Sequence, residues 1–157
     1  MSEKSEKAAN VFNSGFNCAQ SVLSSFIEET GLNRDMALRI TAGLGGGMGR
    51  MQHTCGAVTG ACLVIGALCG SEDAGNEESR EKTIGLTRKF LSAFTDKHGS
   101  VNCKELIGYD LNSEEELMEA GENKVFETKC AAFVKTAVAL LENELAGLQQ
   151  GKRSGQT

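Results

Sequence analysis

The stretch TCGAVTGACLVIGALCGS, residues 54–71, decides the fold. No Asp, Glu, Lys or Arg occurs in it, and the uncharged run begins at Met51. Four glycines and several hydroxyl or thiol side chains interrupt its apolar residues, so the run is too polar for favourable insertion into a bilayer. We therefore expect a buried central helix from about Thr54 to Gly70, not a membrane span.

A glycine-rich segment, GLGGGMGR at residues 43–50, comes directly before this helix. Because no strand precedes it and the Gly-Lys-Ser/Thr of a Walker loop is missing, a nucleotide site is not indicated. Free backbone N–H groups in such a loop, next to a cationic side chain, can bind an anion or surround a cofactor. The candidate cofactor-binding residues are Gly45, Gly46, Gly47, Arg50 and also His53, which could act as a ligand or as a proton donor to Cys55.

The remainder of the chain predicts helices and no strand. Proline is absent, and no segment alternates with period two over a useful length. The expected fold is an all-α bundle of five to seven helices forming one domain over residues 1–146, followed by a frayed polar tail, 147–157. We expect Met36, Leu38 and Ile40 to point mostly inward. The helices outside the central one are expected at residues 3–13, 17–30, 33–40, 77–98 and 127–148. One or two helical turns are expected at 103–107, and a capping box can begin a polar segment at 113–120.

Composition limits the partners and the compartment. The chain has 157 residues and a net charge of −5, without a concentrated basic surface, so nucleic acid is not an expected partner. The N-terminal segment MSEKSEKAANVFNSG has no apolar signal region, and we expect a cytoplasmic location. In that reducing compartment the six cysteines serve better as thiols or metal ligands than as permanent disulfides.

Four of the six cysteines fall in the first turn of an expected helix, where free N–H groups stabilise a thiolate. These are Cys18, Cys55, Cys103 and Cys130, the candidate catalytic and metal-binding residues. The other two, Cys62 and Cys69, follow Cys55 at seven-residue steps of roughly 10.5 Å along one helix face, which predicts plain core residues. Small residues four apart on this helix would let a neighbouring helix bring another sulfur close to Cys55.

Several segments together resemble one protein family. They are NCAQSVL at 17–23, GGGMGR at 45–50 followed by TCGAVTGA at 54–61, NCKELIG at 102–108 and Lys129-Cys130 before an apolar helix. Over residues 5–145 the chain resembles the family of redox-active proteins named C_GCAxxG_C_C. This resemblance implies that Cys18, Cys55, Cys103 and Cys130 are the family cysteines. It also implies a prosthetic group such as an iron–sulfur cluster, and a redox partner protein.

Three kinds of cysteine chemistry remain open at the level of sequence, because thiolates serve in all of them. The four cysteines could hold an iron–sulfur cluster, although the close C-x-x-C spacing of ferredoxins is absent. They could carry thiol–disulfide exchange with Cys55 as the nucleophile. They could instead bind a structural zinc ion. The alternative without cysteine chemistry is a helical interaction module with buried thiols.

Overall fold

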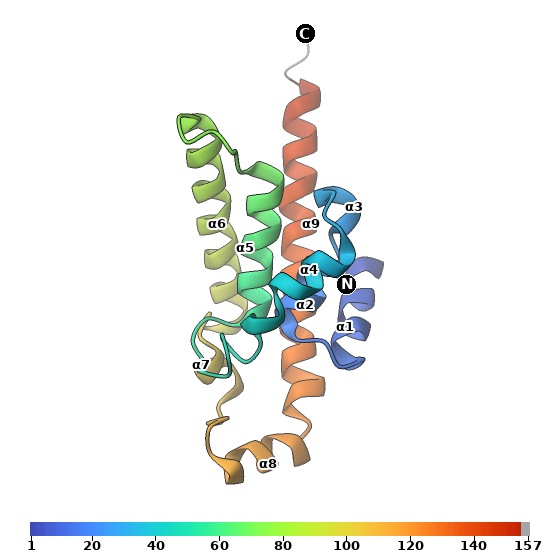
Figure 1. Cartoon of the computed structure of the whole chain (residues 1–157), viewed down its shortest axis with the longest axis vertical. Helices are drawn as coiled ribbons and strands as arrows, with labels where there is room; N and C mark the ends of the chain where they lie inside the picture. Colours follow the sequence, from blue (N-terminus) through green and yellow to red (C-terminus); the bar gives the residue numbers. More distant parts are fainter. Residues whose placement is uncertain (155–157) are drawn as a thin grey trace.

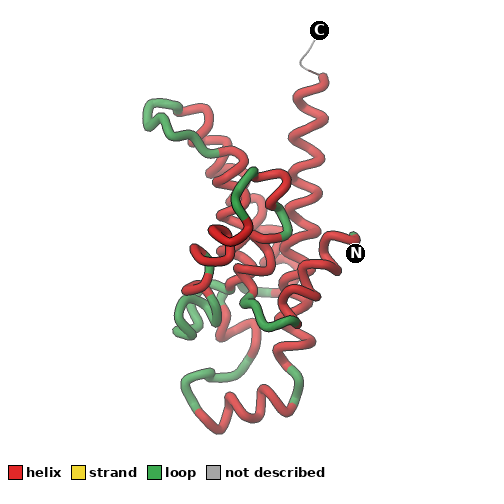
Figure 2. Tube along the Cα trace, turned by 45° about the vertical axis from the view of Figure 1, so that its right-hand side comes forward, coloured by secondary structure: helices red, strands yellow, loops and turns green. Residues whose placement is uncertain are grey.

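The central helix α5 (Gly56–Cys69) lies between α6 (Glu77–His98) and α9 (Ala131–Ser154), which run alongside it in Figure 1. The computed structural model describes residues 1–154, with side chains through residue 148. In this part of the chain all regular structure is helical, which confirms the all-α prediction (Figure 2). The other α-helices are α1 (Glu3–Asn13), α2 (Cys18–Ser24), α3 (Ile27–Thr30), α4 (Arg34–Ile40), α7 (Cys103–Ile107) and α8 (Glu114–Glu122). Two short turns complete the set, the 3₁₀ turn η1 (Ala42–Leu44) and the π-helical turn η2 (Phe126–Cys130).

The hydrophobic core forms where α5 meets α2, α6 and α9. More than half of the α5 residues are buried, and the large side chains packed around it are Phe26, Phe90, Phe94 and Leu141. The helix α1 covers the other side of α9, while α8 lies across the end of the bundle in Figure 1. This arrangement confirms that the uncharged stretch is a buried central helix.

The helices α2 and α5 approach so closely that a Cβ atom at either of two glycines of α5 would crowd the backbone of α2. A Cβ atom on Gly60 would lie 2.9 Å from the carbonyl oxygen of Ala19, and one on Gly56 would lie 3.1 Å from the Ala19 nitrogen. Small residues spaced four apart permit such contact between helix backbones. The predicted close approach of a neighbouring helix is therefore present, and the neighbour is α2.

Two details of the N-terminal half differ from the sequence prediction. The expected helix 17–30 divides into α2 and α3, because Phe26 turns out of the helix and buries its ring completely in the core. On α4, Met36 and Ile40 are about half exposed, since this seven-residue helix packs inward through Ala37. The inward placement expected for Met36 and Ile40 is therefore wrong.

The last helix is longer than expected. It continues to Ser154, so most of the segment expected to be a frayed tail has helical backbone, and residues 155–157 lie outside the described residues. Among the described helices, none combines the length and the apolar character needed to cross a membrane.

Two glycine-to-alanine substitutions on α5 test the helix contact. Gly60→Ala places a methyl group against the Ala19 backbone, and we expect it to lower the free energy of unfolding by about 1–3 kcal/mol. Gly66→Ala is the matched control on the same helix, because a Cβ atom there meets nothing within 4 Å. It should raise stability by up to about 1 kcal/mol through helix propensity. Denaturant unfolding measures both, and equal effects would contradict the proposed tight contact.

Candidate functional site

The close contact between α2 and α5 places Cys18 beside Cys55. Cys18 is the first residue of α2, where the Asn17 side chain caps the helix and Gln20 completes a capping box. Cys55 occupies the N-cap position of α5. A Cβ atom on Gly56 would lie 3.1 Å from the Cys18 Cβ, so the two cysteines flank the same narrow gap between helices.

A short antiparallel pairing fixes Cys103 against the same region. Thr54 and Asn102 form an isolated β-bridge between two loops. The Cys55 N–H donates to the Val101 carbonyl at 2.8 Å, and the Cys103 N–H donates to the His53 carbonyl at 2.7 Å. These bonds hold the start of α7 beside the start of α5, so Cys103 faces the region that already contains Cys18 and Cys55.

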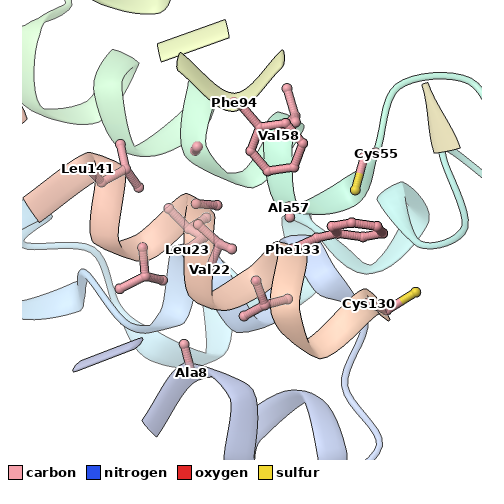
Figure 3. Close-up of a cluster of buried hydrophobic side chains, with 14 of the residues drawn as sticks. Ala8, Val22, Leu23, Cys55, Ala57, Val58, Phe94, Cys130, Phe133 and Leu141 are labelled. Carbon is pink, nitrogen blue, oxygen red and sulfur yellow. The ribbon is translucent and has the colours of Figure 1, made fainter. Parts of the chain in front are cut away.

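The fourth cysteine, Cys130, is the last residue of the π-helical turn η2. The Lys129 ammonium group donates to the Ile107 carbonyl at 3.2 Å and ties this turn to α7. Figure 3 shows Cys130 and Cys55 on the same side of the core, with the Phe133 ring close by. The expectation of a first helical turn is wrong here, because the helical backbone already begins at Val125 and Cys130 closes the π turn. Cys130 thus gains no free helix start, unlike Cys18, Cys55 and Cys103.

The contacts around Cys18 and Cys55 make the two thiols chemically unequal. Cys18 has the sulfurs of Cys130 and then Cys55 within hydrogen-bonding reach, and these contacts together with burial raise its pKa well above the ordinary value. The pKa of Cys55 is lowered, first by the hydrogen bond from the Cys18 thiol. The N–H groups of Ala57 and Val58 lower it further, although the sulfur makes no regular capping hydrogen bond to the helix. Cys55 is therefore the thiol that ionises first of this pair.

Cys103 stays protonated for a different reason. Burial raises its pKa to about 12, with smaller contributions from the negative charges that Cys55 and Cys130 would carry. Its interaction with those two sulfurs is through charge alone, whereas Cys18 is close enough for hydrogen bonding. Cys18 thus pairs with Cys130 and with Cys55, whereas Cys103 acts on Cys55 and Cys130 through charge.

This arrangement is not a ready-made metal site. In the described part of the chain, no three His, Cys, Asp or Glu side chains are grouped so that they could hold a metal ion. All six cysteines are free thiols in the structure. Ligation of a metal or cluster by all four sulfurs would require the cysteines to come closer together than they lie in this structure.

All four cysteines line one cavity of about 920 Å³. Its wall contains most of the glycine loop, Arg50 and residues from the end of α1, the start of α2, α7 and η2. Cys62 and Cys69 are not part of the wall; Cys69 is buried and Cys62 packs at the margin of the core. The cavity therefore separates the six cysteines into the same two groups as the sequence did.

The glycine loop has a left-handed backbone. Every residue from Gly46 to Arg50 has a φ angle between 58° and 69°, and this includes two residues with side chains, Met48 and Arg50. At Gly47 a Cβ atom would lie 2.7 Å from the His53 nitrogen and 2.8 Å from the Cys103 Cβ. The loop can therefore press against Cys103 only because this residue is glycine.

The predicted loop residues take different places. Gly45, Gly46, Gly47 and Arg50 line the cavity with the four cysteines. His53 is exposed and lies outside the lining, where its backbone contributes through the bond to Cys103 and not through its ring.

Sequence reasoning missed two parts of the site. Aromatic rings of Phe12, Phe16 and Phe126 form much of the apolar wall, and no local pattern marks them because they come from distant segments.

The second missed part is Gln52, which is buried with a φ of 58°. Its side chain donates to the Tyr109 carbonyl and accepts from the Leu111 N–H, which fastens the loop to the segment after α7. The one signal for Gln52 in the sequence was that a polar residue follows the glycine segment by two positions.

The fold and site together define a helical protein with four cysteines around a single cavity. A family described as "Putative redox-active protein (C_GCAxxG_C_C)" matches residues 16–144. The chain belongs to this family. Where the family name writes GCAxxG, this chain has the order Cys55-Gly56-Ala57. Neither a curated protein nor a solved structure gives a significant match to the chain.

The loop geometry predicts the effect of one methyl group. Gly47→Ala forces a side chain into a left-handed position against the His53 and Gln52 backbone, and we expect it to cost about 1–3 kcal/mol of stability. It should also expose Cys103, which would then react faster with a thiol reagent in the native protein. Gly43→Ala is the control, because that residue has ordinary φ and open space around its Cβ position. Unchanged Cys103 reactivity in Gly47→Ala would refute the contact.

The lowered pKa of Cys55 gives a second prediction. Alkylation of Cys55 by iodoacetamide, followed by peptide mass spectrometry across pH, should show a midpoint below the value of about 8.5 for an unperturbed thiol. Removing the donor with Cys18→Ala should move the midpoint upward, whereas Cys18→Ser keeps a hydroxyl donor and should move it less. Cys62→Ala serves as the distant control. A midpoint that is unaffected by Cys18→Ala would show that this hydrogen bond does not set the pKa.

Proposed function

We propose that this protein carries out thiol–disulfide exchange, with Cys55 as the nucleophilic thiolate and Cys18 as the resolving thiol. The observation that supports this most directly is the pairing of a thiol of lowered pKa with a protonated thiol in hydrogen-bonding contact. Thiolate is the attacking species in disulfide exchange, so the difference in pKa assigns the two roles. Membership of a redox-active family agrees with the proposal.

In the first step the Cys55 thiolate attacks one sulfur of a substrate disulfide. A bond forms between this sulfur and Cys55, the substrate S–S bond breaks, and the released thiolate leaves with its electron pair. Cys55 loses its negative charge in this step. The hydrogen bond that kept the proton on Cys18 loses its charged acceptor, which favours ionisation of Cys18.

In the second step Cys18 gives its proton to the released thiolate or to solvent and attacks Cys55. A Cys18–Cys55 disulfide forms, and the second substrate thiolate leaves. The protein dithiol has then lost two electrons, and the substrate disulfide has gained them. Cys130, which also contacts Cys18, is the second possible resolving residue.

A second candidate function is ligation of an iron–sulfur cluster by all four cysteines. It is favoured by their presence in the wall of one cavity, which has room for such a group. A bound cluster would supply one-electron transfer. Because no three metal-ligating side chains of the described residues are grouped, whereas Cys18 and Cys55 form a pair, the present arrangement supports disulfide exchange better.

Matched cysteine variants test the proposal. The reduced wild-type protein, treated with a small disulfide, should lose two thiols and contain a Cys18–Cys55 link in a peptide map. Cys55→Ser should prevent this oxidation, and Cys18→Ser should stop it at a mixed disulfide on Cys55. Cys62→Ser and Cys69→Ser should behave as wild type.

Two results would contradict the proposal. One is oxidation that proceeds equally well in Cys55→Ser. The other is stoichiometric iron and acid-labile sulfide in protein purified without oxygen, lost on substitution of any of the four cavity cysteines; that result would support the cluster.

A further inference from the structure

The glycine loop presents backbone N–H groups that have no acceptor in the described protein. Gly45, Gly46 and Gly47 all line the cavity, and none of their N–H groups donates to a carbonyl or side chain of the described residues. Gly47 is also buried. Buried N–H groups without a partner are rare in folded proteins, so this one calls for an acceptor supplied from outside the chain.

A cationic side chain lies directly next to these groups. A Cβ atom on Gly46 would be 2.9 Å from the Arg50 Cγ, so the Arg50 side chain starts over the loop backbone. Arg50 lines the cavity and forms no ion pair with a carboxylate in the described residues. Its left-handed backbone is held in place by hydrogen bonds from its N–H to Gly45 and from Asn112 to its carbonyl. An arginine side chain that shares a cavity wall with free N–H groups is suited to a carboxylate or another oxyanion.

Apolar side chains line much of the remaining cavity wall, together with the polar Asn13, Asn17 and Gln20. Phe12, Phe16 and Phe126 contribute aromatic rings, and Leu106 and Leu111 contribute aliphatic side chains. The aromatic and aliphatic part of the wall favours a flat or apolar ligand body. The only other charged side chain in the lining is Glu127, which lies on η2 and not on the loop.

We infer that the substrate of the cysteine site is a small organic disulfide with an apolar or aromatic body and an anionic group, which the Gly45–Gly47 N–H groups and Arg50 bind while Cys55 attacks the S–S bond. This inference rests on the proposed thiol–disulfide function and specifies its substrate class. The anion-binding groups also compensate for repulsion between an anionic substrate and the Cys55 thiolate. The electron and proton balance is that of the two steps given above.

Two aromatic disulfides of similar size test the inference. One is 5,5′-dithiobis(2-nitrobenzoate), which carries two carboxylates, and the other is the uncharged 4,4′-dithiodipyridine. Stopped-flow rates for both reagents, with Cys55 identified by peptide mass spectrometry, give a ratio of anionic to neutral reactivity. Arg50→Gln should lower this ratio about tenfold, the usual loss for a hydrogen bond to a charged group. Arg50→Lys, which keeps the charge, should lower it less.

The control is Arg88→Gln, because Arg88 is an exposed residue of α6 outside the cavity lining. It should leave the ratio unchanged. An equal ratio in wild type, Arg50→Gln and Arg88→Gln would overturn the inference and leave the proposed function standing, provided that Cys55 still reacts.

A binding measurement separates the anion site from the thiol chemistry. Calorimetry with 4-nitrobenzoate, which has no sulfur, should detect binding to the reduced protein and to Cys55→Ser, and a loss of at least about tenfold in Arg50→Gln. The neutral 4-nitrobenzamide should bind more weakly.

If 4-nitrobenzoate fails to bind, or if a benzyltrimethylammonium ion binds better through Glu127, the anion site is refuted. If it binds while Cys55 is inert to both disulfides, the proposed exchange function fails, the cavity remains an anion site, and the substrate assignment falls with that function.

Discussion

The contact between α2 and α5 is the constraint on which the site depends. It exists because two glycines on α5 allow the backbone of α2 to approach to van der Waals distance. Cys18 is thereby carried to the start of α5, where Cys55 and the N–H groups of Ala57 and Val58 already lie. A larger residue at Gly56 or Gly60 would separate the helices and, with them, the two sulfurs.

The environments around the cysteines show how one residue type acquires different acidities. Cys55 receives hydrogen bonds, so its charged form is favoured despite burial. Cys103 is buried without such donors and keeps its proton. Cys18 lies between other sulfurs and acts as a donor to them. These differences come from the contacts between the thiols, from burial and from the backbone N–H groups at the start of α5.

Local signals allowed much of the fold to be predicted. The bounds of α1 and α6 follow from caps and glycines close in sequence, for example Asn76 before α6 and the left-handed Gly99 after it. The division of the four cavity cysteines from Cys62 and Cys69 also followed from helix position. What sequence reasoning missed depends on tertiary contacts: Phe26 leaves its helix for the core, and Cys130 lies on a π turn. The aromatic cavity wall was missed for the same reason, because its rings meet only after α1 and η2 have packed.

The four cavity cysteines come from four elements that are far apart along the chain, and this links chemistry to folding. A covalent bond between Cys18 and Cys55 would close a loop of about 38 residues, which the chain-entropy relation values at about 4 kcal/mol of lost freedom in the unfolded state. Oxidation would therefore make the chain harder to unfold, and the fold in turn would make the disulfide harder to reduce. The reduction potential of the Cys18–Cys55 pair and the thermal stability of the protein are therefore thermodynamically linked.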